Sequence, residues 1–151
     1  MNFELSDGQK GLKDAISSFC ERELPPAFES ALDEGNEFPH ELYKKIADGG
    51  FFGIPYPAQY GGSDGDMMDV VTITEQLASS SYNAALMYLV PVVFAGMFIL
   101  ANGTEEQKAE YLPRLIDGEL KFAFAMTEPG AGPDPKSMKT AAVEHDDHYA
   151  I

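Results

Sequence analysis

The 151-residue sequence has no tryptophan and only one cysteine, Cys20. A single thiol cannot form a disulfide within the chain, and the first residues lack the basic stretch and apolar run of a secretory signal. We therefore expect a cytoplasmic protein. Phe19 lies beside Cys20 and Ile16 one helical turn before it, so the thiol is expected in the core rather than at a reactive site.

Positive charge is scarce. Ten lysines and arginines stand against 25 aspartates and glutamates, which gives a formal net charge of −15. Such a charge repels nucleic-acid phosphates and anionic lipids, so it argues against nucleic-acid binding and favours a solvated outer face. The three histidines, His40, His145 and His148, lack the spacing of a metal site, and we expect no metal.

Hydrophobic residues make up 44% of the chain, enough for a packed core. Ser6 followed by Gln9 is a capping-box pattern, which predicts a first helix that runs to Pro25-Pro26. A second helix is predicted from Pro39, placed at its first position, to Gly49-Gly50.

Glycine, proline and aromatic residues dominate positions 51–66, which predicts an ordered loop. A further helix is predicted over 67–80, with its inward side formed mostly by Val71, Ile73, Leu77 and Ala78.

The run from Ala84 to Ala101 contains no charge and approaches the length of a membrane span. Pro91 and Gly96 interrupt it, and no basic flank orients it. We expect a central helix buried on most sides and no membrane insertion, with a transmembrane helix as the less favoured alternative.

Thr104 and Gln107 repeat the capping-box pattern and predict a helix to about Ile116, with Pro113 disturbing its last turn. Beyond it the period changes to two: apolar residues over 122–126 alternate with alanines, which predicts a strand that ends in a turn at 128–130. Positions 140–143 and 149–151, joined by the polar turn 144–148, predict a hairpin.

The predicted fold is mainly α: an antiparallel helical bundle over residues 1–120, followed by the first strands of a β domain over 121–151. A lone hairpin is marginal in water, so we expect that β domain to be incomplete in this chain.

Three segments resemble the acyl-CoA dehydrogenase family. The first is Gly50-Phe51-Phe52-Gly53-Ile54-Pro55 with Tyr60-Gly61-Gly62. The second is Gly103-Thr104-Glu105-Glu106-Gln107-Lys108 with Tyr111-Leu112-Pro113. The third and most specific is Met126-Thr127-Glu128-Pro129-Gly130-Ala131-Gly132.

The resemblance implies a helical domain, a middle β domain and a second helical domain, with FAD between them. It implies oxidation of an acyl-CoA thioester between its α and β carbons, electron transfer to an electron-transfer flavoprotein, and a homo-oligomer. The glutamate that removes the α proton is expected in the second helical domain, so the 151-residue piece alone is expected to be inactive.

By the same resemblance, the expected cofactor-binding residues are Phe124, Ala125, Met126, Thr127, Gly132 and Pro133. The residues expected to line the acyl group are Val90, Pro91, Phe94 and Pro133. Pro133 stands where family members commonly carry a serine, and proline offers neither a hydroxyl nor a backbone N–H.

Less specific interpretations stay open. Thr127 could simply end a strand, and Val90, Pro91 and Phe94 could be ordinary core residues. Gly130-Ala131-Gly132 lacks the third glycine of a dinucleotide-binding fingerprint, which excludes a Rossmann fold. A non-catalytic helical assembly domain that keeps the family fold is the alternative function, and Pro133 is the residue that favours it.

Overall fold

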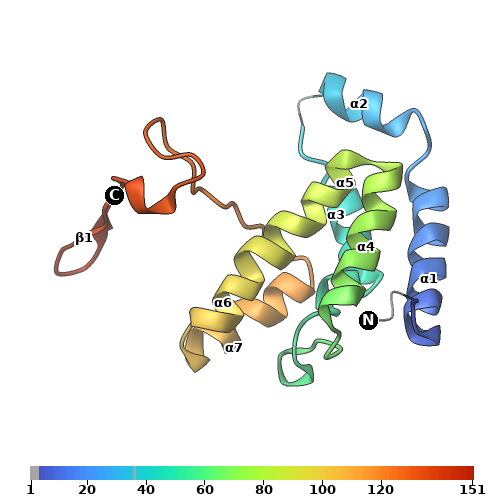
Figure 1. Cartoon of the computed structure of the whole chain (residues 1–151), viewed down its shortest axis with the longest axis horizontal. Helices are drawn as coiled ribbons and strands as arrows, with labels where there is room; N and C mark the ends of the chain where they lie inside the picture. The colour runs from blue at the N-terminus through green and yellow to red at the C-terminus, as the bar shows by residue number, and fades with distance from the viewer. Residues whose placement is uncertain (1–3, 36) are drawn as a thin grey trace.

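The computed structural model describes residues 4–35 and 37–151. Figure 1 shows a helical body and a carboxy-terminal arm that leaves the body after α7 and ends in a small hairpin. The body contains α1 (Asp7–Glu23), α2 (Phe28–Gly35), α3 (His40–Asp48), η1 (Phe51–Gly53), η2 (Ala58–Tyr60), α4 (Met67–Ser80), α5 (Tyr82–Tyr88), η3 (Leu89–Gly96), α6 (Met97–Asn102) and α7 (Glu105–Ile116). The prediction of a mainly α fold is confirmed.

Two helices begin at the predicted capping boxes. In α1 the Gln9 N–H donates to Ser6 Oγ at 3.2 Å and the Ser6 N–H donates to the Gln9 side chain at 3.0 Å. Thr104 and Gln107 make the same exchange at 3.2 and 2.9 Å.

Pro39 lies at the N-cap of α3, one position earlier than predicted. The sequence did not predict α2, which is one of the shorter helices.

The inward face of α4 is only partly the predicted one. Ile73 and Leu77 are completely buried, as expected. Val71 and Ala78 are exposed, so that part of the prediction was wrong. Val70 takes an inward position instead, because residues 70, 73 and 77 follow the helical period and share one face.

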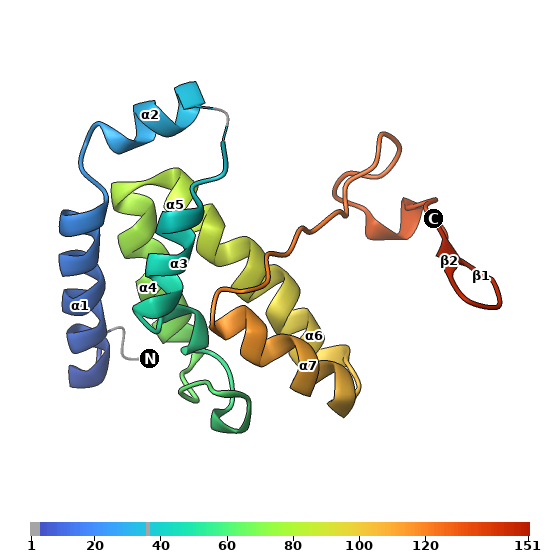
Figure 2. The ribbon, with the colours of Figure 1, turned by 180° about the vertical axis from the view of Figure 1, so that it is seen from behind.

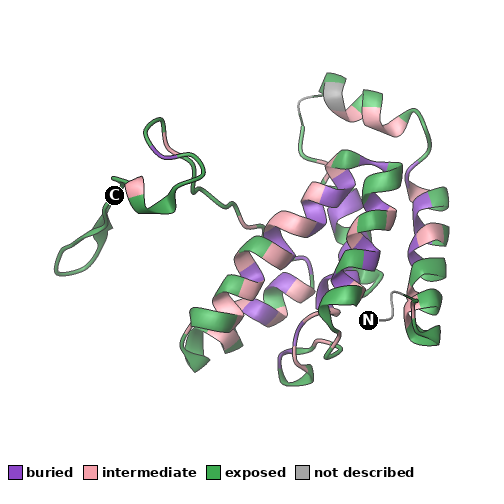
Figure 3. Ribbon diagram, viewed as in Figure 1, coloured by how far each residue is buried: buried purple, intermediate pink, exposed green. Residues whose placement is uncertain are grey.

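Aromatic side chains form the centre of the core. Tyr43 and Phe52 pack edge to face with ring centroids 4.9 Å apart, and the Tyr88 ring lies 6.3 Å from Phe52. Figure 3 shows the buried residues on the sides of the helices that face one another. Cys20 is buried, as predicted, and burial raises the pKa of its thiol.

Residues 51–66 form the predicted ordered loop, built from the short turns η1 and η2. Gly61 has a positive φ of 91°, a conformation that glycine adopts without steric cost. A Cβ at Gly62 would collide with the Tyr56 carbonyl, so two loop segments cross at close range there. Tyr60 Oη donates to Glu105 Oε2 at 2.9 Å and ties the loop to α7.

Residues Tyr82–Asn102 form one continuous helix of 21 residues, made of α5, η3 and α6 and called here the central helix. By length and composition alone it could cross a membrane, and 44% of its most apolar window is buried. The prediction that it is buried on most sides was wrong for its second half. Phe94 is 45% exposed and Phe98 61%, since α7 packs along only one side (Figure 2).

The predicted strand over 122–126 was wrong. These residues are extended, but a strand requires hydrogen-bonded partners in a neighbouring strand, and the described part of the chain supplies none. The predicted hairpin is confirmed in shorter form. Strands β1 (Val143–Glu144) and β2 (Tyr149–Ala150) pair antiparallel, with Val143 opposite Ala150.

Candidate flavin and acyl site

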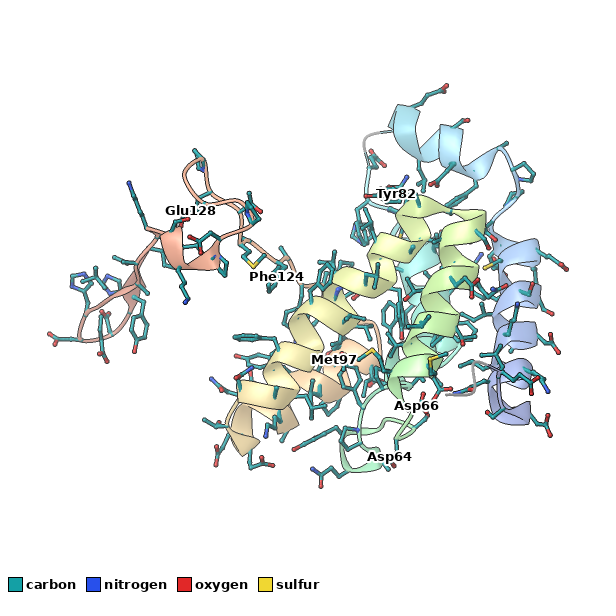
Figure 4. All side chains as sticks on the ribbon, in the orientation of Figure 1. Asp64, Asp66, Tyr82, Met97, Phe124 and Glu128 are labelled. Atoms are coloured by element: carbon teal, nitrogen blue, oxygen red, sulfur yellow. The ribbon has the colours of Figure 1, made fainter. Side chains whose placement is uncertain are left out.

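The extended residues 121–127 pass beside the central helix and border two hollows. The first, called here the arm groove, has a volume of about 560 Å³ and is lined by Phe94 and Phe124, Ala125, Met126 and Thr127. Figure 4 shows Phe124 at the point where the arm passes this helix. The structure thus brings together four of the six predicted cofactor residues and one predicted acyl residue.

The walls of the arm groove are apolar. The Phe94 and Phe124 rings lie 5.8 Å apart between centroids and are inclined by 46°. Both rings and Met126 are exposed, although water is a poor environment for such surface. The groove therefore offers an apolar wall of the size and kind that a flat ring system covers well.

The polar part of the arm groove is backbone. Within the described chain, no hydrogen bond occupies the backbone N–H or C=O groups of residues 124–127. Buried or covered backbone groups are nearly always paired, so these groups are available to a ligand that covers the groove. Free donors beside an apolar wall suit an isoalloxazine ring, which has flat apolar faces and a polar pyrimidine edge.

Glu128 closes the loop that follows the groove. Its carboxylate accepts hydrogen bonds from the Lys139 N–H at 2.9 Å and the Thr140 N–H at 2.8 Å, and these bonds lower the pKa of the carboxyl. The Glu128 and Ala131 backbones also exchange two hydrogen bonds of 3.1 Å. Figure 4 shows the Glu128 side chain inside the arm. Sequence reasoning missed this role, although a carboxylate directly before Pro129-Gly130 was a usable signal for a pinned turn.

Gly132 and Pro133 lie in the loop closed by Glu128, are exposed, and do not line either hollow. Asp134 next to them caps the short turn η4 (Pro135–Ser137) by accepting from the Lys136 N–H at 3.0 Å. The hydroxyl of Ser137 donates to the Asp134 carbonyl at 2.8 Å. That serine is therefore engaged within the loop and does not replace the hydroxyl that Pro133 lacks.

The second hollow, called here the α5 cavity, has a volume of about 470 Å³. Val90 and Pro91 line it, whereas Phe94 lines the arm groove. The predicted acyl residues are thus divided between two neighbouring hollows, one helical turn apart. The other lining residues come from α2, the segment before α3, α3 itself, α5 and the start of the arm: Leu32, Glu37, Phe38, Pro39, Tyr43, Asn83, Leu86, Met87, Lys121 and Phe122.

The helix between the two hollows is π-helical in η3. Pro91 gives a physical reason, since proline has no N–H and its ring crowds the carbonyl one turn earlier. Tyr56 Oη donates to the Val92 carbonyl at 2.5 Å and so ties the π-helical segment to the loop 51–66. Burial raises the pKa of Tyr56, so its hydroxyl stays a donor.

The two histidines of the hairpin pack against each other. His145 and His148 stack with ring centroids 4.8 Å apart, and His148 Nδ1 lies 2.7 Å from Asp147 Oδ1. Across residues 4–35 and 37–151, no three His, Cys, Asp or Glu side chains are grouped to hold a metal ion.

By fold, the chain is an α-helical domain with an extended arm. The model of the acyl-CoA dehydrogenase N-terminal domain matches residues 6–119. The chain therefore belongs to the acyl-CoA dehydrogenase family.

Individual relatives support the same family assignment. The chain is 41% identical to the caffeyl-CoA reductase-Etf complex subunit CarC of Acetobacterium woodii, over 97% of this chain and 38% of the relative. It is 42% identical to a 3-(aryl)acrylate reductase of Clostridium sporogenes, over 88% of this chain and 35% of the relative. The chain thus spans less than two fifths of the length of these two relatives.

A solved structure has the same fold. A glutaryl-CoA dehydrogenase from Mycobacterium smegmatis, in complex with FADH2, superposes with a TM-score of 0.85 at 26% identity, covering 94% of this chain and 36% of that chain.

Proposed function

We propose that the polypeptide that carries this chain is an FAD-dependent oxidoreductase that acts on the α and β carbons of an acyl-CoA thioester. The observation that carries the proposal is the adjacency of the two hollows. The arm groove and the α5 cavity share the central helix and the start of the arm, with Pro91 facing one and Phe94 the other. A flavin in the groove would place its ring beside an acyl group in the cavity.

FAD, when bound, supplies the two-electron chemistry by accepting or returning a hydride. This chain's part is to bind and orient. Phe94, Phe124 and Met126 would cover the apolar face of the ring, and the Thr127 hydroxyl and the backbone N–H groups would donate to its polar edge, where negative charge grows on reduction. Val90 and Pro91 limit the depth available to the acyl group.

The proposal extends to the partners and the setting. One relative is named as a subunit of an Etf complex, which supports an electron-transfer flavoprotein as the redox partner. We also propose a homo-oligomer in the cytoplasm, with the proton-abstracting glutamate in a later domain of the polypeptide. The 151-residue piece alone is then inactive and binds FAD weakly, since the arm groove forms only one wall of the site.

An absorbance spectrum of the purified full-length protein, followed by anaerobic titration with acyl-CoA thioesters, tests the proposal. We expect a flavin band that the thioesters bleach. Thr127→Val should weaken FAD binding by about fivefold, the loss of roughly one hydrogen bond, while Thr74→Val on α4 should leave it unchanged. No flavin band, together with no binding of added FAD, would overturn the proposal.

A second candidate is a non-catalytic assembly domain that keeps the fold. Pro133 favours it, because that position offers neither a hydroxyl nor an N–H to a ligand. The same titration separates the two candidates: an assembly domain would leave any bound flavin oxidised at saturating thioester, whereas the enzyme would reduce it.

A further inference from the structure

The lining of the α5 cavity includes three aromatic side chains and one cation, Lys121. Phe38 and Tyr43 pack edge to face with centroids 5.6 Å apart, and Phe122 and Met87 line the same cavity. Lys121 Nζ lies 5.1 Å from the Tyr43 ring centroid and 5.8 Å from that of Phe38. Lys121 is exposed, and an ammonium beside the cavity offers nothing to a plain alkyl chain.

The position of Lys121 is built into the fold. Tyr43 Oη donates to the Leu120 carbonyl at 2.7 Å, which fastens the start of the arm to α3 directly before the lysine. The ion pairs among the described residues do not include Lys121, although Glu37 lines the same cavity. Its charge is therefore directed at aromatic faces rather than neutralised by a carboxylate.

We propose that the α5 cavity is a site for an aryl group, so that the substrate is a 3-arylpropionyl or 3-arylacrylyl thioester whose ring binds between Phe122, Met87 and the Lys121 ammonium. An aromatic ring gains edge-to-face contacts with Phe38 and Phe122 and a sulfur contact with Met87. A cation beside the cavity attracts the electron-rich face of such a ring and does nothing for an alkyl chain.

This inference rests on the proposed function and names its substrate class. In the oxidative direction, the saturated thioester loses an α proton to the base expected outside residues 1–151 and a β hydride to FAD, and a Cα=Cβ bond conjugated with the ring forms. The names of two relatives, which refer to caffeyl-CoA and to 3-(aryl)acrylates, agree with this substrate class.

The test uses the full-length holoenzyme and anaerobic flavin reduction by 3-phenylpropionyl-CoA and butyryl-CoA. We expect the second-order rate constant of flavin reduction, measured below saturating thioester, to favour the aryl thioester by at least about tenfold. Lys121→Met, similar in length but uncharged, should lower that ratio by about twofold to fivefold, and Lys121→Arg should largely keep it. Lys13→Met, at an exposed site on α1, is the matched control and should change neither rate.

Three other outcomes would each overturn the aryl assignment. Equal rates for the two thioesters would overturn the aryl assignment while leaving the proposed function intact. An equal loss of both rates in Lys121→Met would make the lysine a structural residue and would also overturn it. Failure of every thioester to bleach the flavin would overturn the proposed function, and this inference with it.

Discussion

Tyr56 and Val92 are joined by a hydrogen bond of 2.5 Å from the tyrosine hydroxyl to the backbone carbonyl, between the loop 51–66 and the π-helical turn η3. Both residues are completely buried. The Val92 carbonyl also accepts from the Met97 N–H, so the tyrosine adds a second hydrogen bond in the part of the helix that Pro91 disturbs. It ties the loop to the segment that separates the two hollows.

Tyr56→Phe is expected to lower the free energy of unfolding by about 0.5–1.5 kcal/mol, the usual net contribution of one hydrogen bond, because the Val92 carbonyl loses the tyrosine donor but keeps the Met97 N–H. Denaturant unfolding of the full-length protein measures the change. Tyr88→Phe is the matched control: the Tyr88 hydroxyl is buried without a partner among the described residues, so its removal should be neutral or stabilising. Equal destabilisation by both variants would contradict the prediction.

Gly96→Ala should also destabilise, by about 1–3 kcal/mol, since a Cβ there would collide with the Tyr56 hydroxyl and lie 2.6 Å from Leu115 Cδ2. Gly11→Ala, in an exposed position of α1 with open space around it, should instead stabilise by about 0.5–1 kcal/mol. Thermal unfolding of the two variants should therefore shift in opposite directions. A neutral Gly96→Ala would mean that η3 moves away from Tyr56 freely.

How well the sequence predicted the structure depends on how local each signal is. Capping boxes at Ser6 and Thr104 were placed correctly, since a cap is decided by residues three apart. The strand over 122–126 failed because alternation describes the side chains and not whether a partner strand is present. The burial of Val71 and Phe94 was misjudged for a related reason: hydrophobicity alone does not say which side of a helix another element covers.

In the candidate site, too, the local features could be predicted from the sequence and the non-local ones could not. Residues 124–127 could be placed together from the family motif, and the structure puts them on one groove. The separation of Phe94 from Val90 and Pro91 depends on the path of the arm across the helix, which no local pattern records. Lys121 and Tyr43 meet through the contact between α3 and the arm, residues distant in sequence, and so the aromatic cavity was not visible from the sequence.

Acid should open the loop closed by Glu128. Its folded-state pKa is lowered by the backbone bonds, so the carboxylate's contribution is fully present above the ordinary glutamate pKa of about 4.3 and is lost as pH falls through the lower folded value. Hydrogen exchange of the Lys139 and Thr140 amides, corrected for intrinsic rates, should accelerate below that pH. Glu128→Ala should expose both amides already at neutral pH, whereas Glu144→Ala in the hairpin should not.

Pro133 provides the sharpest test of how the loop contributes to cofactor binding. Pro133→Ser introduces both a hydroxyl and an N–H, whereas Pro133→Ala introduces the N–H alone. If the loop covers the flavin in the full-length protein, each added donor should tighten FAD binding, by about fivefold per hydrogen bond, in the order proline, alanine, serine. Fluorescence titration of the apoprotein with FAD gives the three dissociation constants. If the alanine and serine variants both bind FAD like the parent, position 133 faces away from the cofactor, which its exposed position in this chain permits. The difference from the family serine would then have no effect on flavin affinity.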